Sequence, residues 1–178
     1  SASSNDFFSI IDRLKENSKV IYKGFGCNKG LAIAIDYGCR LAIRDGYEYL
    51  ITFDQDSIMT EGTIAKMVNS LCNNANYGMA APNLKRLYRK NNTRVFTDEI
   101  VYPQKDEIVA WSITSGSMFR LKDYESNGGI DTMLFIGQID QDYCCKVNNI
   151  THKEIIRFGN VYMYQELGEI GRASCRER

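Results

Sequence analysis

Stretches of the chain differ in the spacing of their apolar residues, and this spacing predicts helices in some and strands in others. Apolar side chains recur three and four positions apart in stretches that predict amphipathic helices, at 5–16, 31–44 and 60–72. Short runs rich in β-branched and aromatic residues predict strands, at 20–22, 47–53, 77–82, 95–101, 108–114, 118–121 and 155–164. A polar helix and turn follows at 123–129, and another helix is expected to begin at Ile139. This order predicts an α/β fold with a mixed, mostly parallel central sheet flanked by helices.

The stretch at 47–57 combines a predicted strand with acidic residues. Its apolar part reads as a strand buried on both faces, and Asp54-Gln55-Asp56 follows directly. Ligands of open α/β sheets bind at the carboxyl ends of the strands, and paired carboxylates there can hold Mg²⁺ or Mn²⁺. Such a cation can in turn hold a diphosphate. The alternative is an acidic turn that only closes the strand, because an isolated Asp-x-Asp is short and common.

Three other segments carry candidate chemistry at predicted strand or helix ends. Asn28-Lys29-Gly30 precedes a helix whose free N–H groups favour an anion, or it serves only as a turn. Ser115-Gly116 offers a hydroxyl and bare backbone to a ligand, or it too is a plain turn. Asp140 and Asp142 begin a helix, where carboxylates complement the dipole whether or not they are catalytic.

A basic stretch at 85–92 separates two predicted strands. Its charge predicts a solvated, mobile loop, and contact with a phosphate is the alternative.

Composition narrows the class of protein. Lysine and arginine number 22 and aspartate and glutamate 22, so no net basic field favours nucleic acid. No apolar run approaches the ~20 residues of a membrane-spanning helix, and no signal peptide is visible. We therefore expect a cytoplasmic protein, or one at the inner face of the membrane with at most peripheral association. The six cysteines lack the spacing of a zinc site and are expected to be reduced thiols.

The two ends of the sequence look cut. The chain starts without Met in a Ser-rich stretch, and 168–178 has almost no apolar content or period. We expect one partial domain over 1–167 and a non-native tail over 168–178.

Four segments, taken together and in order, resemble the family 2 glycosyltransferases of the GT-A (Rossmann-like) nucleotide-diphospho-sugar transferase fold, and more narrowly their bacterial rhamnosyltransferase branch. These segments are Asn28-Lys29-Gly30-Leu31-Ala32-Ile33-Ala34, Leu50-Ile51-Thr52-Phe53-Asp54-Gln55-Asp56-Ser57, Thr114-Ser115-Gly116-Ser117 and Leu134-Phe135-Ile136-Gly137-Gln138-Ile139-Asp140-Gln141-Asp142-Tyr143-Cys144. Asp-Gln-Asp-Ser after an apolar strand is the most specific of them.

The resemblance implies roles for residues of this sequence. Asp54 and Asp56 would bind Mg²⁺ or Mn²⁺, with Asp54 also facing the nucleotide, and Asp140 would be the catalytic base. The donor site would include Asn28, Lys29 and Gly30, and the sugar and acceptor pocket Ser115, Gly116 and Asp142. Gln165 stands at the metal-binding or diphosphate-binding position where many relatives have His, and an amide cannot carry positive charge. The family's first strand and the acceptor-side C-terminal region are expected to be missing.

The function implied is inverting transfer of a sugar, rhamnose from dTDP-rhamnose being suggested by the branch. The acceptor would be a saccharide or lipid-linked saccharide in the synthesis of cell-surface polysaccharide or O-antigen. The alternatives are a nucleotidyltransferase and an inactive fragment that only binds nucleotide.

Overall fold

The computed structural model describes residues 9, 12–14, 16–91 and 93–166. The helices with bounds inside this part are α2 Leu31–Arg44, α3 Thr63–Asn73 and α4 Ile139–Asn149. Seven strands form one sheet: β1 Tyr49–Ile51, β2 Ile58–Met59, β3 Tyr77–Lys90, β4 Thr93–Ile100, β5 Glu107–Val109, β6 Met118–Arg120 and β7 Glu154–Glu166. A short 3₁₀ helix, η1 Leu121–Asp123, follows β6.

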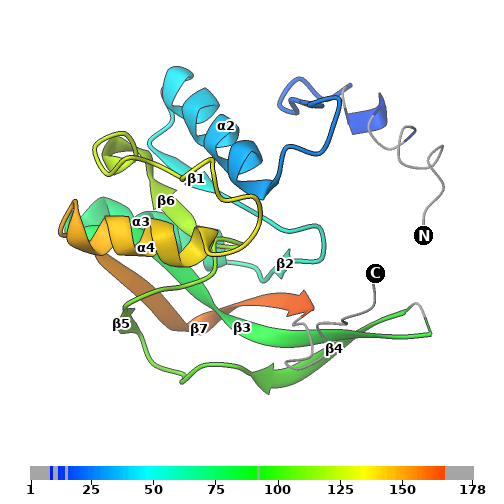
Figure 1. The fold of residues 1–178 in the computed structure, drawn as a ribbon. Helices are drawn as coiled ribbons and strands as arrows, with labels where there is room; N and C mark the ends of the chain where they lie inside the picture. The colour runs from blue at the N-terminus through cyan, green and yellow to red at the C-terminus, as the bar shows by residue number, and fades with distance from the viewer. Residues whose placement is uncertain (1–8, 10–11, 15, 92, 167–178) are drawn as a thin grey trace, which may run out of the picture.

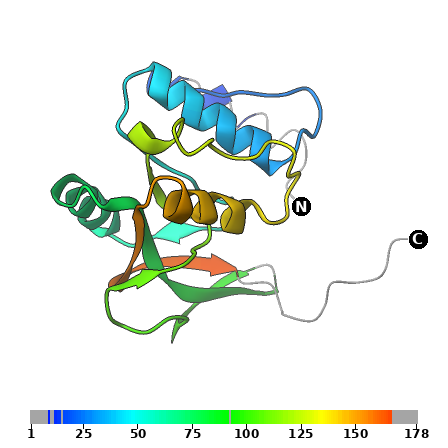
Figure 2. The same ribbon diagram turned by 60° about the vertical axis from the view of Figure 1, so that its left-hand side comes forward.

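The helices cover both faces of the sheet (Figures 1 and 2). Side chains of α2 and α4 pack with Met79, Phe119 and Ile155 in one apolar cluster. Met67 and Leu71 of α3 pack with neighbours of those strand residues, such as Ala80 and Met118, in a second cluster. Because successive strand side chains point to opposite faces, the two clusters are the two sides of one sheet. The result is a three-layer α/β/α arrangement.

The sheet is mixed, as predicted, but the expected parallel majority is wrong. The strand order is β1-β6-β3-β7-β2, with β4 paired to β3 and β5 paired to β7. In the described residues β3 and β7 are the only two named strands that pair in parallel, and the remaining pairs are antiparallel. Parallel neighbours need a long crossover connection, whereas β3 and β4 are joined by a tight hairpin turn. The α/β prediction itself is confirmed.

The prediction that the strand before the acidic pair is buried on both faces is wrong. β1 lies at one end of the strand order, and all three of its residues are only half-buried. The stretch 20–22 is also not a strand, and Ile21 is 66% exposed. A strand needs a neighbour for its backbone hydrogen bonds, and within the described ranges no strand pairs with 20–22 or with the outer edge of β1.

The basic stretch 85–92 is a β-hairpin, so the prediction of a loop is wrong up to Lys90. β3 continues to Lys90, and β4 returns from Thr93. Asn91 adopts a positive φ of 49°, which asparagine tolerates in tight turns. Lys85 pairs with Asp98 at 3.1 Å and Arg86 with Glu99 at 2.9 Å, so two of the charges that suggested a loop are matched across the two strands.

Other predictions fall partly outside the described residues. Residues 9 and 12–14 of the helix expected at 5–16 are helical, Glu16 lies in a turn, and the other residues of this range lie outside the described ones. The predicted tail 168–178 lies outside the described residues, so the boundary of the domain at 167 stays a prediction. In the part of the chain that the structure describes, no helix is both long and apolar enough to cross a bilayer.

A buried asparagine holds the long strands together. Asn83 is fully buried, and its amide nitrogen lies 3.0 Å from the Tyr102 carbonyl, 3.2 Å from that of Pro103 and 3.4 Å from that of Gly159. Its amide oxygen accepts the backbone N–H groups of Leu84 and Tyr102. This side chain therefore joins β3 to β7 and to the segment after β4, where the β3–β7 register shifts.

We expect Asn83→Leu to lower the free energy of unfolding by about 2–4 kcal/mol, because it leaves several buried backbone groups without partners. Urea unfolding measures the change. Asn73→Ala, at an exposed position at the end of α3, is the control and should stay within about 0.5 kcal/mol of the parent. An Asn83→Leu protein as stable as the parent would contradict this role.

Candidate functional site

The acidic loop lies directly after β1 and is fixed to the turn at 114–117. Thr52 forms a parallel bridge with Ser115, and the Gly116 N–H donates to the Thr52 carbonyl at 2.7 Å. The loop closes with a hydrogen bond of 3.1 Å from the Ser57 N–H to the Asp54 carbonyl. β2 then pairs with β7. Asp54 and Asp56 are therefore carried on a short, tethered connection at the end of the strand.

Ser115 supplies the main tether of that loop. It is only 4% exposed. Its hydroxyl accepts the Asp54 N–H at 3.0 Å and lies 2.8 Å from the Ser57 hydroxyl. The hydroxyl that was expected to line a sugar pocket is thus already bonded within the protein, where it positions the acidic loop.

Asp140 is held by the residue before Ser115. It lies in the first turn of α4, and its Oδ1 accepts the Thr114 N–H at 2.8 Å. The adjacent residues Thr114 and Ser115 therefore hold Asp140 on one side and the Asp54 loop on the other. The structure brings these two parts of the predicted site together.

Gln165 also reaches the acidic loop. β7 places it opposite Arg86 of β3, and its Nε2 donates to Asp54 Oδ2 at 3.2 Å. The residue is only 9% exposed, and its Oε1 has no hydrogen-bond partner. A buried amide oxygen without a donor is an unsatisfied acceptor, which a cation or a donor group of a ligand would satisfy.

The three carboxylates make this region unfavourable for further negative charge. The pKa of Asp54 is raised, chiefly because its carboxylate is partly removed from water and then because Asp56 and Asp140 repel its charge. A hydrogen bond from Ser115 opposes the rise. In the described residues no lysine or arginine forms an ion pair with Asp54, Asp56 or Asp140.

These groups fit a hard divalent cation in their chemistry. Carboxylate and amide oxygens are the ligands that Mg²⁺ and Mn²⁺ prefer. Across the described ranges no three Asp, Glu, His or Cys side chains gather closely enough to hold a metal by themselves. The protein would therefore offer Asp54, Asp56 and the unsatisfied oxygen of Gln165 rather than three charged ligands.

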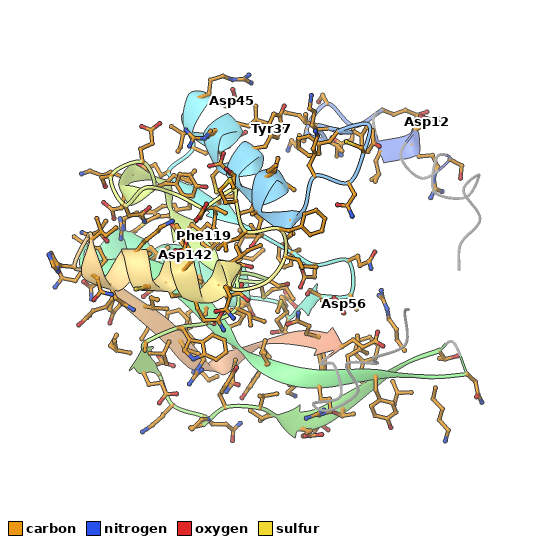
Figure 3. All side chains as sticks on the ribbon, viewed as in Figure 1. Asp12, Tyr37, Asp45, Asp56, Phe119 and Asp142 are labelled. Carbon is orange, nitrogen blue, oxygen red and sulfur yellow. The ribbon has the colours of Figure 1, made fainter. Side chains whose placement is uncertain are left out.

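Asp142 lies away from this group. Residues two positions apart on a helix point about 200° apart, and Asp142 pairs with Lys146 at 2.7 Å on the side of α4 near the Gly129 carbonyl. Figure 3 shows Asp142 on α4 and Asp56 on the β1–β2 loop, well separated. A single helix cannot direct both Asp140 and Asp142 at one pocket.

The hydrogen bonds of the turn at Asn28–Gly30 stabilise the turn and attach it to Phe135. Asn28 Oδ1 accepts the Gly30 N–H at 3.0 Å, and the Phe135 carbonyl accepts the Leu31 N–H at 2.8 Å. Gly30 has φ +88°, and an added Cβ would lie 2.6 Å from the Phe135 oxygen. Lys29 is exposed. The turn thus contacts the segment that leads into α4, and within the described residues no hydrogen bond or ion pair joins it to the three carboxylates.

Gly116 is required by packing rather than by a ligand. It has φ +73°, and a Cβ there would lie 2.3 Å from the sulfur of Met163 on β7. The bare backbone noted in the sequence is covered by that side chain.

Two contributors to the site were not identified from the sequence. Thr114 acts through its backbone N–H, which residue type does not reveal. Arg94 lies on β4, and its Nη2 is 3.5 Å from the carbonyl of Gln55, the middle residue of the acidic triplet. No local signal could have connected a hairpin arginine to a loop 39 residues earlier.

Two cavities lie elsewhere. One, of about 490 Å³, is lined by residues around Tyr47 and Lys122, and the other, of about 360 Å³, lies between α2 and the outer edge of β1. The candidate carboxylates line neither of them. We base the site on the carboxylates, because Asp54 and Asp56 follow the carboxyl end of β1, where ligands of α/β sheets bind.

Comparison with known proteins supports the family. The family model for glycosyl transferase family 2 matches residues 2–136. The chain is 30% identical over 154 residues to the dTDP-rhamnosyl transferase RfbF of Shigella flexneri, covering 80% of this chain and 51% of that protein. It therefore spans about half the length of this curated relative.

A solved structure shares the fold. The crystal structure of GalNAc-T7 with UDP, GalNAc and Mn²⁺ superposes with a TM-score of 0.69 at 10% identity, over 94% of this chain and 36% of the other. This likeness bears on the fold alone, and it confirms the predicted GT-A architecture. The family model matches most of this chain, and the chain therefore belongs to glycosyl transferase family 2.

Proposed function

We propose that this protein is an inverting glycosyltransferase, which transfers a sugar from a nucleotide-sugar donor to a saccharide acceptor. The observation that carries the proposal is the joint placement of the Asp54 loop and Asp140 by Thr114 and Ser115. This arrangement sets a candidate metal-binding group beside a candidate base in a family 2 chain.

Asp54, Asp56 and Gln165 would hold Mg²⁺ or Mn²⁺. The bound cation would supply Lewis-acid stabilisation of the leaving nucleoside diphosphate. Asp54 Oδ2 already accepts a hydrogen bond from Gln165, which leaves its Oδ1 available as a ligand. The raised pKa of Asp54 and the unsatisfied Gln165 oxygen both support a cation here.

Asp140 would act as the general base. Its Oδ1 is held by Thr114, so its Oδ2 is the oxygen that can accept the proton of the acceptor hydroxyl. The acceptor oxygen forms a bond to C1 of the sugar while the bond from C1 to the diphosphate oxygen breaks. The proton moves to Asp140, and the electron pair of the broken bond leaves with the nucleoside diphosphate.

The donor we propose is dTDP-rhamnose, supported by the likeness to a dTDP-rhamnosyl transferase. In this proposal Asn28, Lys29 and Gly30 lie on the donor side, and Ser115 acts by positioning Asp54. Gly116 and Asp142 are left out of this proposal, because Met163 covers Gly116 and Asp142 pairs with Lys146 away from Asp140. The acceptor would be a saccharide or lipid-linked saccharide of a cell-surface polysaccharide, reached with at most peripheral contact to the membrane.

The two alternatives are separable by product. A nucleotidyltransferase releases pyrophosphate from a nucleoside triphosphate, whereas a glycosyltransferase releases a nucleoside diphosphate from the nucleotide sugar. A chain that only binds nucleotide gives a ligand-dependent rise in melting temperature without either product.

Asp140→Asn tests the base. The asparagine keeps the shape and can still accept the Thr114 N–H, but it cannot take a proton. We expect the release of nucleoside diphosphate to slow by about 100-fold or more, with binding of nucleoside diphosphate unchanged. Gln141→Ala, at an exposed neighbouring position on α4, is the control. Turnover of Asp140→Asn within a few-fold of the parent would exclude Asp140 as the base.

The raised pKa of Asp54 predicts a pH-dependent response to metal. The folded protein holds this proton more tightly than the unfolded chain does, so ionisation of Asp54 opposes folding as the pH rises above its unfolded pKa. A bound cation offsets that repulsion, and protons displace it as the pH falls through the raised pKa. Mn²⁺ should therefore raise the melting temperature at pH 7.5, and the rise should become progressively smaller as the pH is lowered.

Asp54→Asn should remove this response while leaving the metal-free protein at least as stable as the parent, because the mutual repulsion is relieved. Thermal unfolding with and without Mn²⁺ measures both effects. A variant that keeps the full response to Mn²⁺ would show that Asp54 is not a ligand.

Opposite changes at Gln165 separate a ligand from a hydrogen-bond donor. Gln165→Glu replaces the amide with a third carboxylate near Asp54 and Asp56, so it should tighten Mn²⁺ binding and destabilise the metal-free protein. Gln165→Leu removes the oxygen and should weaken Mn²⁺ binding. Titration calorimetry measures both affinities. If Gln165 serves only to donate to Asp54, Gln165→Leu will bind Mn²⁺ as tightly as the parent.

A further inference from the structure

The β3–β4 hairpin brings a cation to the acidic loop. In Figure 1 the hairpin extends away from the helices on the side of the molecule where the loop between β1 and β2 lies. Arg94 of β4 donates from Nη2 to the Gln55 carbonyl at 3.5 Å, between Asp54 and Asp56 in the sequence. This contact uses one of the five N–H donors of the guanidinium, and the others remain available.

The hairpin is held at this place by contacts next to Gln165. Phe96 of β4 meets Tyr164 of β7 edge to face, with ring centroids 5.0 Å apart. Arg86 of β3 is in register with Gln165. The arm that carries Arg94 is thus fixed to the strand whose amide already contacts Asp54.

Arg94 differs from Lys85 and Arg86 of the same hairpin in having no acidic partner among the described side chains. Lys85 is matched by Asp98 and Arg86 by Glu99. Arg94 instead lies beside a loop whose carboxylates also have no basic partner in the described ranges. An exposed guanidinium that is not neutralised by the protein is suited to an anionic ligand.

The charge of a nucleoside diphosphate calls for both a divalent metal ion and a basic side chain. A nucleoside diphosphate brings two or three negative charges, and the Gln165 amide contributes none to offset them. A divalent cation held by Asp54 and Asp56 leaves part of that charge unmatched. A guanidinium matches phosphate oxygens with paired N–H groups, which a lysine cannot reproduce.

We propose that Arg94 binds the diphosphate of the nucleotide-sugar donor, so that the β3–β4 hairpin is a donor-binding arm of the site. This inference rests on the proposed function, because it takes the ligand of the acidic loop to be a nucleoside diphosphate. Arg94 binds the phosphate oxygens on the hairpin side, and the Gln55 carbonyl keeps the guanidinium beside the loop.

The test is titration of dTDP and UDP, each with Mn²⁺, into the parent, Arg94→Ala, Arg94→Lys and Lys90→Ala. Lys90 is an exposed cation of the same hairpin and serves as the control for loss of one positive charge. We expect Arg94→Ala to weaken binding of the nucleoside diphosphate by about fivefold to tenfold and Arg94→Lys by less. Lys90→Ala should stay within about twofold of the parent. The corresponding monophosphate should be affected less than the diphosphate by Arg94→Ala.

The outcomes separate this inference from the proposed function. If the parent binds dTDP or UDP and Arg94→Ala binds it equally well, Arg94 has no role in donor binding and the proposed function stands. If Lys90→Ala weakens binding as much as Arg94→Ala does, the effect is general charge and the specific contact is wrong. If the parent binds neither nucleoside diphosphate with Mn²⁺, the proposed function fails and this inference fails with it.

Discussion

The dipeptide Thr114-Ser115 fixes the position of Asp140 relative to the loop that carries Asp54. One backbone N–H holds Asp140 at 2.8 Å, and the next side chain holds the Asp54 loop at 3.0 Å. Both bonds are made by groups with little freedom to move, because Ser115 is also bridged to Thr52. The distance between Asp140 and the Asp54 loop is therefore set by two adjacent residues rather than by two independent loops. A site held in this way needs little reorganisation when a substrate binds.

The rest of the sheet supports that turn from the other side. Met163 of β7 fills the space against Gly116, and Gln165 two residues later contacts Asp54. β7 can reach both because it runs in parallel beside β3 and is held there by Asn83. The single parallel pair of named strands in the described residues is thus the pair that aligns the end of β7 with the acidic loop. The hairpin of β3 and β4 extends from the same place and brings Arg94 to Gln55.

Membership of glycosyl transferase family 2 agrees with this arrangement of acidic side chains, but it does not account for the individual contacts. The likeness in fold to GalNAc-T7 holds at 10% identity, so the arrangement of strands is retained where almost no side chains are. The relative from Shigella flexneri is more similar in sequence, and about half of its length matches this chain. The uncharged amide of Gln165 at the end of β7 and the position of Arg94 beside the loop are features of this chain's own residues. In this chain a basic side chain reaches the loop from the β3–β4 hairpin.

Local pattern by itself determined much of this protein. The helical period located α2 and α3, since each buries one face whatever lies opposite it, and α4 begins at Ile139 as expected. The acidic triplet after an apolar strand and the Asp140 segment were recognisable because residue type and spacing carry that chemistry. The direction of the strands, the edge position of β1 and the hairpin at 77–100 were decided only by the tertiary structure. Strand pairing depends on residues far apart in the chain, and the alternation of apolar residues is the same for either direction of a neighbour. The backbone bond from Thr114 to Asp140 and the reach of Arg94 to Gln55 were undetectable for the same reason, because each joins groups brought together only by folding.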